Sequence, residues 1–532
     1  MKRVNKFKKS AFSIISIFLI VISGFANSPS YYNIRDFGAT GNGKVLDTNA
    51  INNAIEAAAE AGGGTIFFPA GTYLSYSIRL QSNIHLYLSA GAILKAAGKN
   101  DGGRYDPPGE GAGNNYQDFG HSYWKNSLIW GIGLNNISIS GTGIILGENL
   151  SRGFYAYQKW DEKGIPAGHL MWEGGGNKTI ALKLCTNVVF KDFTVIKGGH
   201  FGILATGVDN FTIDNLKIDT NRDGIDIDAC RNVRISNCTV NSPNDDAIVL
   251  KSSFALGFPQ ATENVTITNC QVSGYDVGTL IDGTFQTKEG HLVPDQEGPT
   301  GRIKFGTESN GGFKNISISN CVFEHSRGLA LETVDGGLLE DVTISNITMR
   351  DLTNSPFFLR LAGRMRGPEN TPIGKLRRIN ISNINIYNAD SHFSSIVSGI
   401  PGHYIEDVRF SNINIWYRPL DSAKTQIQEL VPEHIKTYPE PAKMGIMPAY
   451  GFFVRHAKNI EIHDINIYHL GDEIRPALIL DDVKNVELFN VDAQKVENAP
   501  VLKIKDSGEI EIEDCDALKD RKIKEIETQD YG

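Results

Sequence analysis

The strongest constraint on the fold is a repeat of about two dozen residues that runs through most of the chain. Twelve segments share one pattern, and "NVRISNCTV" at residue 232 and "NVTITNCQV" at residue 264 are typical of them. The shorter spacings between successive segments cluster near about 24 residues, and three longer spacings are close to twice that length. Self-similarity of this length is typical of a solenoid, in which each turn packs only on its neighbours.

Each segment alternates apolar and polar residues, which is the period of a strand and not of a helix. An Asn recurs in the middle of the segments, where the chain must turn, because Asn tolerates the left-handed conformation and bonds neighbouring backbone. Stacked one per coil, these Asn side chains are expected to form a ladder. The pattern predicts an all-β fold, a right-handed parallel β-helix of short strands and tight turns.

The two ends of the solenoid differ from the repeats between them. The stretch "DTNAINNAIEAAAEAGGG" (47–64) predicts a helix that caps the N-terminal end, with Asp47 or Thr48 as N-cap and the Gly run as its stop. The tail "KDRKIKEIETQD" (519–530) is highly charged, and we expect it to be a frayed exterior end.

The N-terminus has the pattern of a secretory signal peptide. Basic residues between positions 2 and 9 precede the apolar stretch Ala11–Ile22, which is short for a membrane span, and small residues precede Asn27. We therefore expect a signal over residues 1–26, a single β-helix domain over 27–532, and a secreted or periplasmic protein. An uncleaved N-terminal anchor is the alternative. No later apolar run is long enough to span a bilayer.

The net charge and the cysteine content limit the binding partners and the cysteine chemistry that the chain can have. The 532 residues carry a net charge of −9, which argues against nucleic acid, because phosphate binding needs basic patches. Six Cys in a chain of this length do not form a disulfide scaffold, and three of them occupy the same slot of the repeat. We expect buried free thiols, no zinc site and a monomer.

The stretch "NRDGIDIDACRNVRISNCTVNSPNDDAIVLKS" (221–252) is the most acidic passage of the chain. Asp223 and Asp245 are one repeat apart, so they are expected to stack on neighbouring coils about 4.8 Å apart, with Asp246 beside them. Carboxylates this close raise the pKa of at least one member, so that an acid and a base coexist, as glycoside hydrolysis requires. We predict no cofactor and no metal; a calcium site is the alternative.

Two further acids of this stretch are expected to lie on an ordinary solvent-exposed face. In "GIDID" the Ile residues alternate with Asp226 and Asp228, which predicts Ile inward and Asp outward on a solvated face. Sugar contact is the alternative for both.

These residues resemble glycoside hydrolase family 28, the polygalacturonase and rhamnogalacturonan hydrolase group. The similarity begins at "YNIRDFGATGNGKVLDTNAINNAI" (32–55) and continues to the last coils. The family's Asn-Thr-Asp motif resembles 221–223, and its Gly-Asp-Asp motif resembles 244–246, followed by "AIVLKS". The resemblance implies a right-handed parallel β-helix and inverting hydrolysis without a metal. It also implies that Asp245 is the general acid and that Asp223 and Asp246 activate water.

The chain departs from polygalacturonases at two motifs. Their Gly-His-Gly corresponds to "TGRIKFGTES", where Gly301 takes the His position and Arg302 follows. Their Arg-Ile-Lys, which holds a substrate carboxylate beyond the cleaved bond, corresponds to Ala330, Leu331 and Glu332. Because Glu332 would repel a carboxylate, the departure favours a neutral sugar there, as in rhamnogalacturonan, where rhamnose alternates with galacturonic acid.

Several other residues are candidate substrate contacts. Lys251, Arg302 and Lys304 are candidates for an acidic sugar, with exposed solvated charge as the alternative. His200 lies one repeat before Asp223 and is expected in the same column. In the long loop 105–127, Tyr123 and Trp124 are candidates for stacking on sugars, and His121 is a candidate for hydrogen bonding. Glu308 and Glu332 are expected either to bond hydroxyl groups or to serve the structure. Arg360, Arg364 and Arg366 lie in an expected insertion at 357–367 and are candidates for binding an acidic sugar, with solvated charge at the rim as the alternative.

The predicted function is a secreted glycoside hydrolase whose substrate is pectic polysaccharide or oligosaccharide, of rhamnogalacturonan type and exo-acting. A polygalacturonase on homogalacturonan is the second hypothesis. A calcium-dependent pectate lyase on the same fold and a catalytically silent sugar-binding β-helix are alternatives from other classes.

Overall fold

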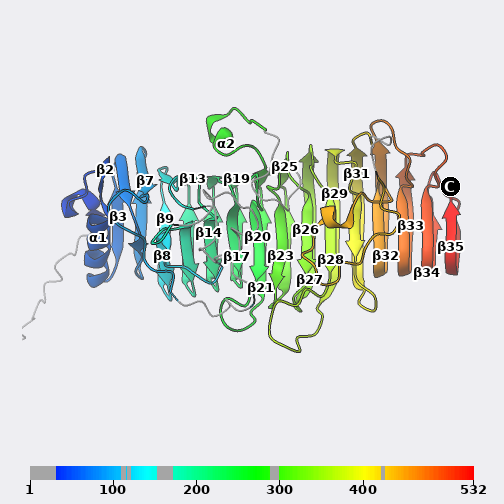
Figure 1. The fold of residues 1–532 in the computed structure, drawn as a ribbon, viewed down its shortest axis with the longest axis horizontal. Helices are drawn as coiled ribbons and strands as arrows, with labels where there is room; N and C mark the ends of the chain where they lie inside the picture. Colours follow the sequence, from blue (N-terminus) through cyan, green and yellow to red (C-terminus); the bar gives the residue numbers. More distant parts are fainter. Residues whose placement is uncertain (1–30, 110–115, 117–120, 152–171, 288–298, 421–425) are drawn as a thin grey trace, which may run out of the picture.

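The computed structural model describes residues 31–109, 116, 121–151, 172–287, 299–420 and 426–532. The expected signal peptide lies outside these residues. Thirty-five strands form one continuous sheet that winds into coils stacked along a single long axis (Figure 1), and all neighbouring strands but one pair are parallel. The predicted parallel β-helix is confirmed.

Three stacks of strands, each with about one strand per coil, make up the sides of the β-helix, and we call them walls A, B and C. Wall A contains β5 (Ile78–Arg79), β8 (Ser127–Ile132), β11 (Lys178–Lys183), β14 (Phe201–Thr206), β17 (Asp223–Asp228), β20 (Ile248–Ser252), β23 (Ile303–Ser309), β26 (Leu329–Thr333), β28 (Phe357–Leu361) and β30 (Ser395–Ser398), and continues in the first parts of β32 (Phe452–His469), β33 (Leu478–Ala493) and β34 (Leu502–Glu513).

Wall B contains β1 (Tyr31–Asn33), β3 (Gly64–Phe68), β6 (Ile84–Leu88), β9 (Asn135–Ser140), β12 (Thr186–Lys191), β15 (Asp209–Asp214), β18 (Arg231–Ser236), β21 (Thr262–Thr268), β24 (Phe313–Ser319), β27 (Leu338–Arg350), β29 (Lys375–Ala389) and β31 (Ile405–Tyr417). Wall C contains β2 (Asn42–Leu46), β4 (Gly71–Ser75), β7 (Ala92–Ala96), β10 (Ile144–Leu146), β13 (Thr194–Ile196), β16 (Lys217–Asp219), β19 (Thr239–Asn241), β22 (Gln271–Ser273) and β25 (Val322–Glu324), and continues in the second parts of β27, β29 and β31. Few helices interrupt these walls: the described ones include η1 (Ile34–Phe37), α1 (Thr48–Glu60), α2 (Thr279–Asp282) and η4 (Pro441–Met444).

Helix α1 covers the N-terminal end of the coils, as predicted, and buries Ile51 and Ile55 against the core (Figure 1). Asp47 occupies the N-cap position but makes no cap bond within the helix. Its carboxylate instead accepts hydrogen bonds from the backbone N–H groups of Thr40, at 2.7 Å, and Gly41, at 3.2 Å. The opposite end differs from the prediction: the tail is not frayed, because β35 (Arg521–Tyr531) pairs antiparallel with β34.

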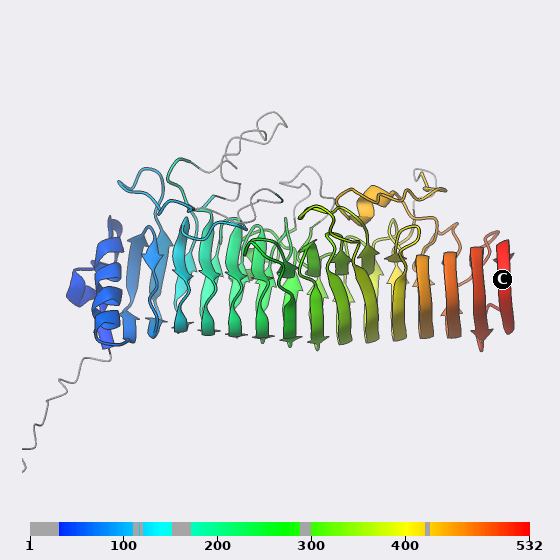
Figure 2. The ribbon, with the colours of Figure 1, turned by 90° about the horizontal axis from the view of Figure 1, so that it is seen from below.

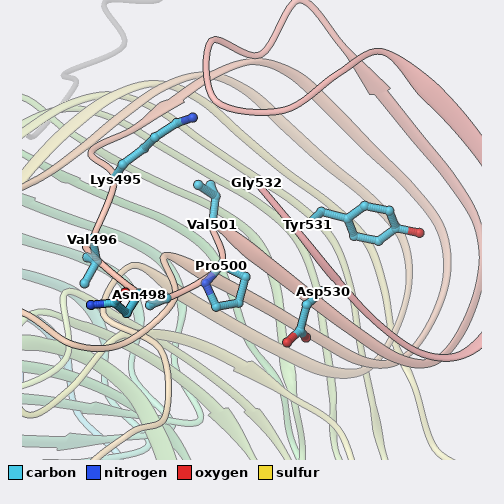
Figure 3. A pocket seen from close by; sticks show the side chains of 9 residues that line it. Lys495, Val496, Asn498, Pro500, Val501, Asp530, Tyr531 and Gly532 are labelled. Atoms are coloured by element: carbon cyan, nitrogen blue, oxygen red, sulfur yellow. The ribbon is translucent and has the colours of Figure 1, made fainter.

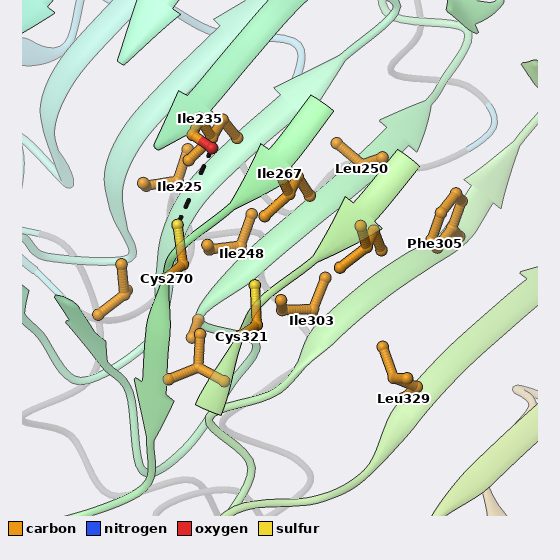
Figure 4. Packing of buried hydrophobic residues seen from close by; sticks show 14 of the residues in the cluster. Ile225, Ile235, Ile248, Leu250, Ile267, Cys270, Ile303, Phe305, Cys321 and Leu329 are labelled. Atoms are coloured by element: carbon orange, nitrogen blue, oxygen red, sulfur yellow. Dashed lines mark hydrogen bonds between the residues drawn. The ribbon is translucent and has the colours of Figure 1, made fainter. Parts of the chain in front are cut away.

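The turns and the core match the repeat. The Asn residues in the middle of the segments have positive φ, as at Asn346 (φ 57°), and their side chains form the expected ladder. For example, the amide of Asn383 donates to Asn346 at 3.2 Å, and that of Asn346 donates to Asn320 at 3.2 Å. Stacked Ile side chains fill the interior together with buried thiols such as Cys270 (Figure 4). All six Cys are buried and free, as expected.

The spacings near twice the repeat contain no additional coil. Val265 in β21 pairs directly with Ile316 in β24, and Val408 in β31 pairs directly with Ile460 in β32. Each long spacing is therefore one coil plus an inserted loop. The loops gather over one side of the molecule (Figure 2), where every residue of β14 and β17 is buried, whereas β18 in wall B alternates between buried and exposed residues.

Among the described residues, no helix has the combination of length and apolar character needed to cross a bilayer.

Candidate active site

Three aspartates converge on wall A, as the spacing predicts. Asp223 begins β17, and Asp245 and Asp246 lie in the turn that leads to β20. One carboxylate oxygen of each residue lies within 4.8 Å of the others. The winding of the β-helix thus brings together groups that are more than twenty residues apart in the sequence.

The register of this cluster differs from the predicted one by one residue. Ile225 pairs with Ile248, and the Gly224 N–H donates to the Asp246 carbonyl at 3.1 Å, so Asp246 and not Asp245 is level with Asp223. The turn before β20 is one residue longer than the turn before β17, whose strand pairs Asp223 with Phe201.

The predicted column position of His200 is wrong for the same reason. Because Phe201 is the residue level with Asp223, His200 is level with Arg222. The His200 ring is buried, and its centroid lies 4.4 Å from that of the Phe201 ring.

Asp223 and Asp245 have opposite protonation tendencies. Burial raises the pKa of Asp223 well above its ordinary value, and the charge of Asp245 adds to this rise, although the Lys251 ammonium lies 3.1 Å away. Burial also opposes ionisation of Asp245, but the charges of Arg222, at 2.6 Å, and of Lys251 hold the pKa of Asp245 below its ordinary value. Of the two, Asp223 therefore binds a proton more readily and Asp245 ionises more readily.

Asp246 is held by two cations of wall A. Its Oδ1 accepts a hydrogen bond from Arg302 Nε at 2.8 Å, and its Oδ2 lies 3.6 Å from Lys304 Nζ. Arg302 also contacts Glu440 at 3.3 Å, and Lys304 donates to the Tyr438 hydroxyl at 3.1 Å. Asp246 is thus fixed by a network that includes a distant loop.

The alternative of exposed, solvated cations is wrong for Lys251, Arg302 and Lys304. Their exposed fractions are 6%, 3% and 1%. Lys251 lies within 3.1 Å of both Asp223 and Asp226 and within 3.6 Å of Glu308. Each of the three cations neutralises buried acids, which explains how so many carboxylates share one small volume.

The prediction that Asp226 and Asp228 face solvent is wrong, because covering loops bury the outer side of wall A. Asp228 accepts hydrogen bonds from the backbone N–H (2.7 Å) and hydroxyl (2.5 Å) of Ser253, and burial together with the Asp226 charge raises its pKa to about 6. Asp226 lies 3.4 Å from His121 Nε2, and neither of its oxygens makes a well-aligned hydrogen bond. The alternation itself, with Ile inward, is correct.

The predicted sugar-stacking role of Tyr123 and Trp124 does not fit their burial. Both rings are buried. Trp124 packs with Phe201 and Leu204, and its Nε1 donates to Thr206 at 3.2 Å. Trp124 thus anchors the end of the loop on wall A.

His121, in the same loop, brings Nε2 to 2.5 Å from Lys251 Nζ. The expected hydrogen-bonding role of His121 is therefore directed at a lysine of the site. Residues 110–115 and 117–120 of this loop lie outside the described residues.

A second loop, residues 426–451, reaches the site and was not predicted. Met444 and Met447 pack against Phe358 and Phe453 on the outer side of wall A. This docking carries Tyr438 and Glu440 to Lys304 and Arg302. The only sequence signal is the long spacing before residue 459.

The predicted insertion at 357–367 is correct only in part: Phe357–Leu361 is strand β28 of wall A, and Arg364 and Arg366 lie in the long connection from β28 to β29. Its arginines serve the structure. Arg360 donates to Ser398 Oγ at 2.7 Å and to the carbonyl of Glu433, and Arg364 pairs with Asp335, whose Oδ1 also accepts from the Arg366 backbone N–H at 2.9 Å.

Glu332, like Asp226, is a buried acid of the site whose oxygens make no hydrogen bond. It is fully buried, neither of its oxygens has a hydrogen-bond partner, and Lys304 Nζ lies 3.5 Å away. Burial raises its pKa to about 7, although Lys304 counteracts the rise. Glu308 behaves differently: burial opposes ionisation, but Lys251, Arg364 and other nearby positive groups together outweigh it and keep the pKa below its ordinary value.

The acids do not fit a divalent metal. Asp223, Asp245 and Asp246 form one group with ligand atoms close enough to hold an ion, and His121, Asp223 and Asp226 form another. In both groups the acids already bind protein cations: Lys251 contacts Asp223 and Asp226, and Arg222 contacts Asp245. A divalent ion at either position would have to bind carboxylates that these buried cations already contact, and the nearby positive charges would repel it.

A separate depression of about 500 Å³ lies at the C-terminal end, far along the chain from the aspartates. It is lined by Lys495, Val496, Asp530 and Tyr531 among others (Figure 3). None of the candidate site residues lines it.

Comparison with known proteins finds similarity in sequence and in fold. Residues 31–247, which contain all three aspartates, match the family model described as rhamnogalacturonase A/epimerase, pectate lyase-like. A probable polygalacturonase from Vitis vinifera is 24% identical over 345 residues. These residues cover 60% of this chain and 61% of the relative, so the chain spans about three fifths of that relative's length.

Two solved structures share the fold. The family 28 exopolygalacturonase of Yersinia enterocolitica has a TM-score of 0.61 and 19% identity, covering 86% of this chain and 78% of that one. The hyperthermoactive exopolygalacturonase of Thermotoga maritima has a TM-score of 0.55 and 20% identity, covering 73% and 87%. The chain therefore shares the right-handed parallel β-helix fold of these structures, and its residues 31–247 are similar to the rhamnogalacturonase A/epimerase, pectate lyase-like family.

Proposed function

We propose that the protein hydrolyses glycosidic bonds in pectic polysaccharide or oligosaccharide that contains galacturonic acid. The observation that carries this proposal is the convergence of Asp223, Asp245 and Asp246, with the pKa of Asp223 raised and that of Asp245 lowered. Asp245 gives a proton to the leaving oxygen as the bond to the anomeric carbon breaks. Asp223 and Asp246 take the proton of the water that forms the new bond.

The stereochemistry is proposed to be inverting, by the resemblance to family 28. Inverting enzymes typically separate their two carboxyl groups by about 6.5–9.5 Å, which leaves room for a water molecule. The anomeric form of the first product, read by NMR, decides between inversion and retention.

We propose rhamnogalacturonan-type specificity, with a neutral sugar on the leaving side. Glu332 stands where polygalacturonases have a cation, and Lys304 is already paired with Asp246 and Glu332. A carboxylate next to Glu332 would meet like charge, whereas a hydroxyl group would supply the hydrogen bonds that the Glu332 oxygens lack.

We also propose exo action. The ends of two loops dock on wall A on either side of the aspartates, one through Trp124 and one through Met444 and Met447. Loops in these positions limit the length of a bound chain. The likeness to two exopolygalacturonases supports the same proposal.

The test is turnover of defined oligosaccharides by Asp245→Asn and Asp223→Asn. Each substitution is expected to lower kcat by about 10²- to 10⁴-fold, because it removes acid or base catalysis while keeping the side-chain shape. Asp209→Asn, which removes an acid of wall B paired with Arg231, is the matched control and should retain activity. Wild-type turnover in either active-site variant would contradict the role of these residues.

The substrates separate the competing functions. Homogalacturonan and rhamnogalacturonan oligosaccharides distinguish the two hydrolase specificities, and product length distinguishes exo from endo action. New ultraviolet absorbance from an unsaturated product, lost with a chelator, would identify a calcium-dependent lyase instead. Binding without turnover would identify a sugar-binding protein.

We further propose that the protein is secreted or periplasmic and acts as a monomer. The signal-like residues 1–26 support the first point. N-terminal sequencing of the protein from culture supernatant and light scattering of the purified protein test the two points.

A further inference from the structure

The ion pair between Arg222 and Asp245 lies on the open side of the acid cluster. Arg222 Nη2 lies 2.6 Å from Asp245 Oδ2, and the two side chains are 15% and 17% exposed. The deeper pairs are less accessible: the side chains of Asp223 and Lys251 are 4% and 7% exposed. A ligand that enters from solvent therefore meets this ion pair before the deeper charges.

The same ion pair conflicts with the proposed chemistry. A general acid must carry a proton before the bond breaks. Asp245 instead lies 2.6 Å from the Arg222 guanidinium, whose charge favours the ionised carboxylate and lowers the pKa of Asp245, whereas the pKa of Asp223 is raised. Catalysis thus requires an event that takes the Arg222 charge away from Asp245.

We propose that Arg222 is a specificity-determining residue that exchanges Asp245 for the carboxylate of the bound galacturonic acid. This inference rests on the proposed function. A guanidinium binds carboxylates with a planar pair of hydrogen bonds, so a uronic acid is a matched competitor for Asp245. The deeper cations Lys251 and Arg302 each bind at least two buried acids, so turning outward would break several buried ion pairs at once.

The exchange also moves the proton to where the reaction needs it. Once Arg222 binds the substrate carboxylate, Asp245 loses the cation that keeps it ionised. A proton bound to Asp223 then passes to Asp245, and Asp223 becomes the carboxylate that accepts a proton from water. No proton enters or leaves, and the substrate carboxylate stays ionised. Activation of the acid is thereby coupled to the presence of a uronic acid.

The first test measures binding without turnover. Calorimetry on the Asp223→Asn variant compares a galacturonic-acid-containing oligosaccharide with the same oligosaccharide after reduction of its carboxyl groups. Adding Arg222→Gln should weaken binding of the acidic ligand by about 10-fold or more and leave the reduced ligand unchanged. Adding Arg222→Lys, which keeps the charge, should recover part of the affinity.

The outcomes separate this inference from the proposed function. Equal affinity of the single and double variants for the acidic ligand would overturn the inference alone. No binding of either ligand by Asp223→Asn would overturn the proposed function and the inference with it.

The second test is kinetic. With the carboxyl-reduced substrate, Arg222→Gln should move the alkaline limb of kcat/KM to higher pH, because an acid without a neighbouring cation keeps its proton to higher pH. With the acidic substrate, kcat/KM should fall by about 10-fold or more. Arg231→Gln, which removes a cation paired with Asp209 on wall B, is the control. Equal losses on both substrates would contradict the exchange.

Discussion

At the residue scale, the site is a set of buried charges whose protonation depends on a few neighbours. Glu332 and Glu308 lie on adjacent coils of wall A and are both buried, yet their pKa values move in opposite directions. Glu332 has only Lys304 within ion-pair distance, at 3.5 Å, and Glu308 has Lys251 at 3.6 Å and Arg364 at 3.7 Å. The number of close cations, and not burial alone, determines the direction.

The Glu332 carboxyl group should make stability fall as pH rises. Its pKa is about 7 in the folded protein against an ordinary 4.5, so the folded state binds more protons between these values. The loss approaches about 3 kcal/mol above pH 7. Glu332→Gln, which cannot ionise, should therefore melt at a higher temperature than wild type at pH 8 and show little difference at pH 4.

Glu308→Gln is the matched comparison and has the opposite sign. Because the folded pKa of Glu308 is depressed, its ionised form stabilises the protein above pH 4.5, and the variant should melt below wild type at pH 8. Thermal unfolding of the three proteins across this pH range measures both effects. Parallel pH profiles for wild type and Glu332→Gln would contradict the assignment.

At the element scale, inserted loops complete a site that the coils only begin. Residues 426–451 leave the solenoid between β31 and β32 and dock over β28, β30 and β32. Their Glu440 bonds Arg327 at 2.6 Å and Arg302 at 3.3 Å, and Arg302 holds Asp246 at 2.8 Å. Glu440 is therefore a positioning residue that acts on Asp246 through Arg302.

Glu440→Gln should lower kcat by about 10-fold or more and change KM little, because Arg302 would hold Asp246 less firmly while the sugar contacts remain. Steady-state kinetics measure the two parameters, and Glu440→Asp should restore part of kcat. Leu430→Ala, at a residue of the same loop that is 81% exposed, is the control. An unchanged kcat for Glu440→Gln would show that the loop serves only as a cover.

At the scale of the whole molecule, stacking of coils requires that the end of the sheet be covered. β35 runs antiparallel to β34 and pairs with it from Leu502–Tyr531 to Ile512–Arg521, which ends the parallel stacking. Deletion of residues 519–532 should expose the hydrogen-bonding edge of β34 and cause concentration-dependent association. Light scattering at increasing protein concentration measures this, with Lys522→Gln as the control. A deletion variant that stays monomeric would contradict the capping role.

The sequence by itself determined the parallel β-helix, its helical N-terminal cap, the Asn ladder and the meeting of Asp223, Asp245 and Asp246. All of these follow from local alternation and a fixed repeat, because a residue in a solenoid contacts the residue one repeat away. Only the tertiary structure decided the one-residue shift in register, the burial of Asp226, Asp228 and Trp124, and the arrival of Glu440. The register depends on the lengths of the turns, and the burial and the arrival of Glu440 depend on loops that return across wall A. The repeat pattern encodes neither. Protonation depended on the tertiary structure as well, since it is set by the distances between charges that the folded chain buries together.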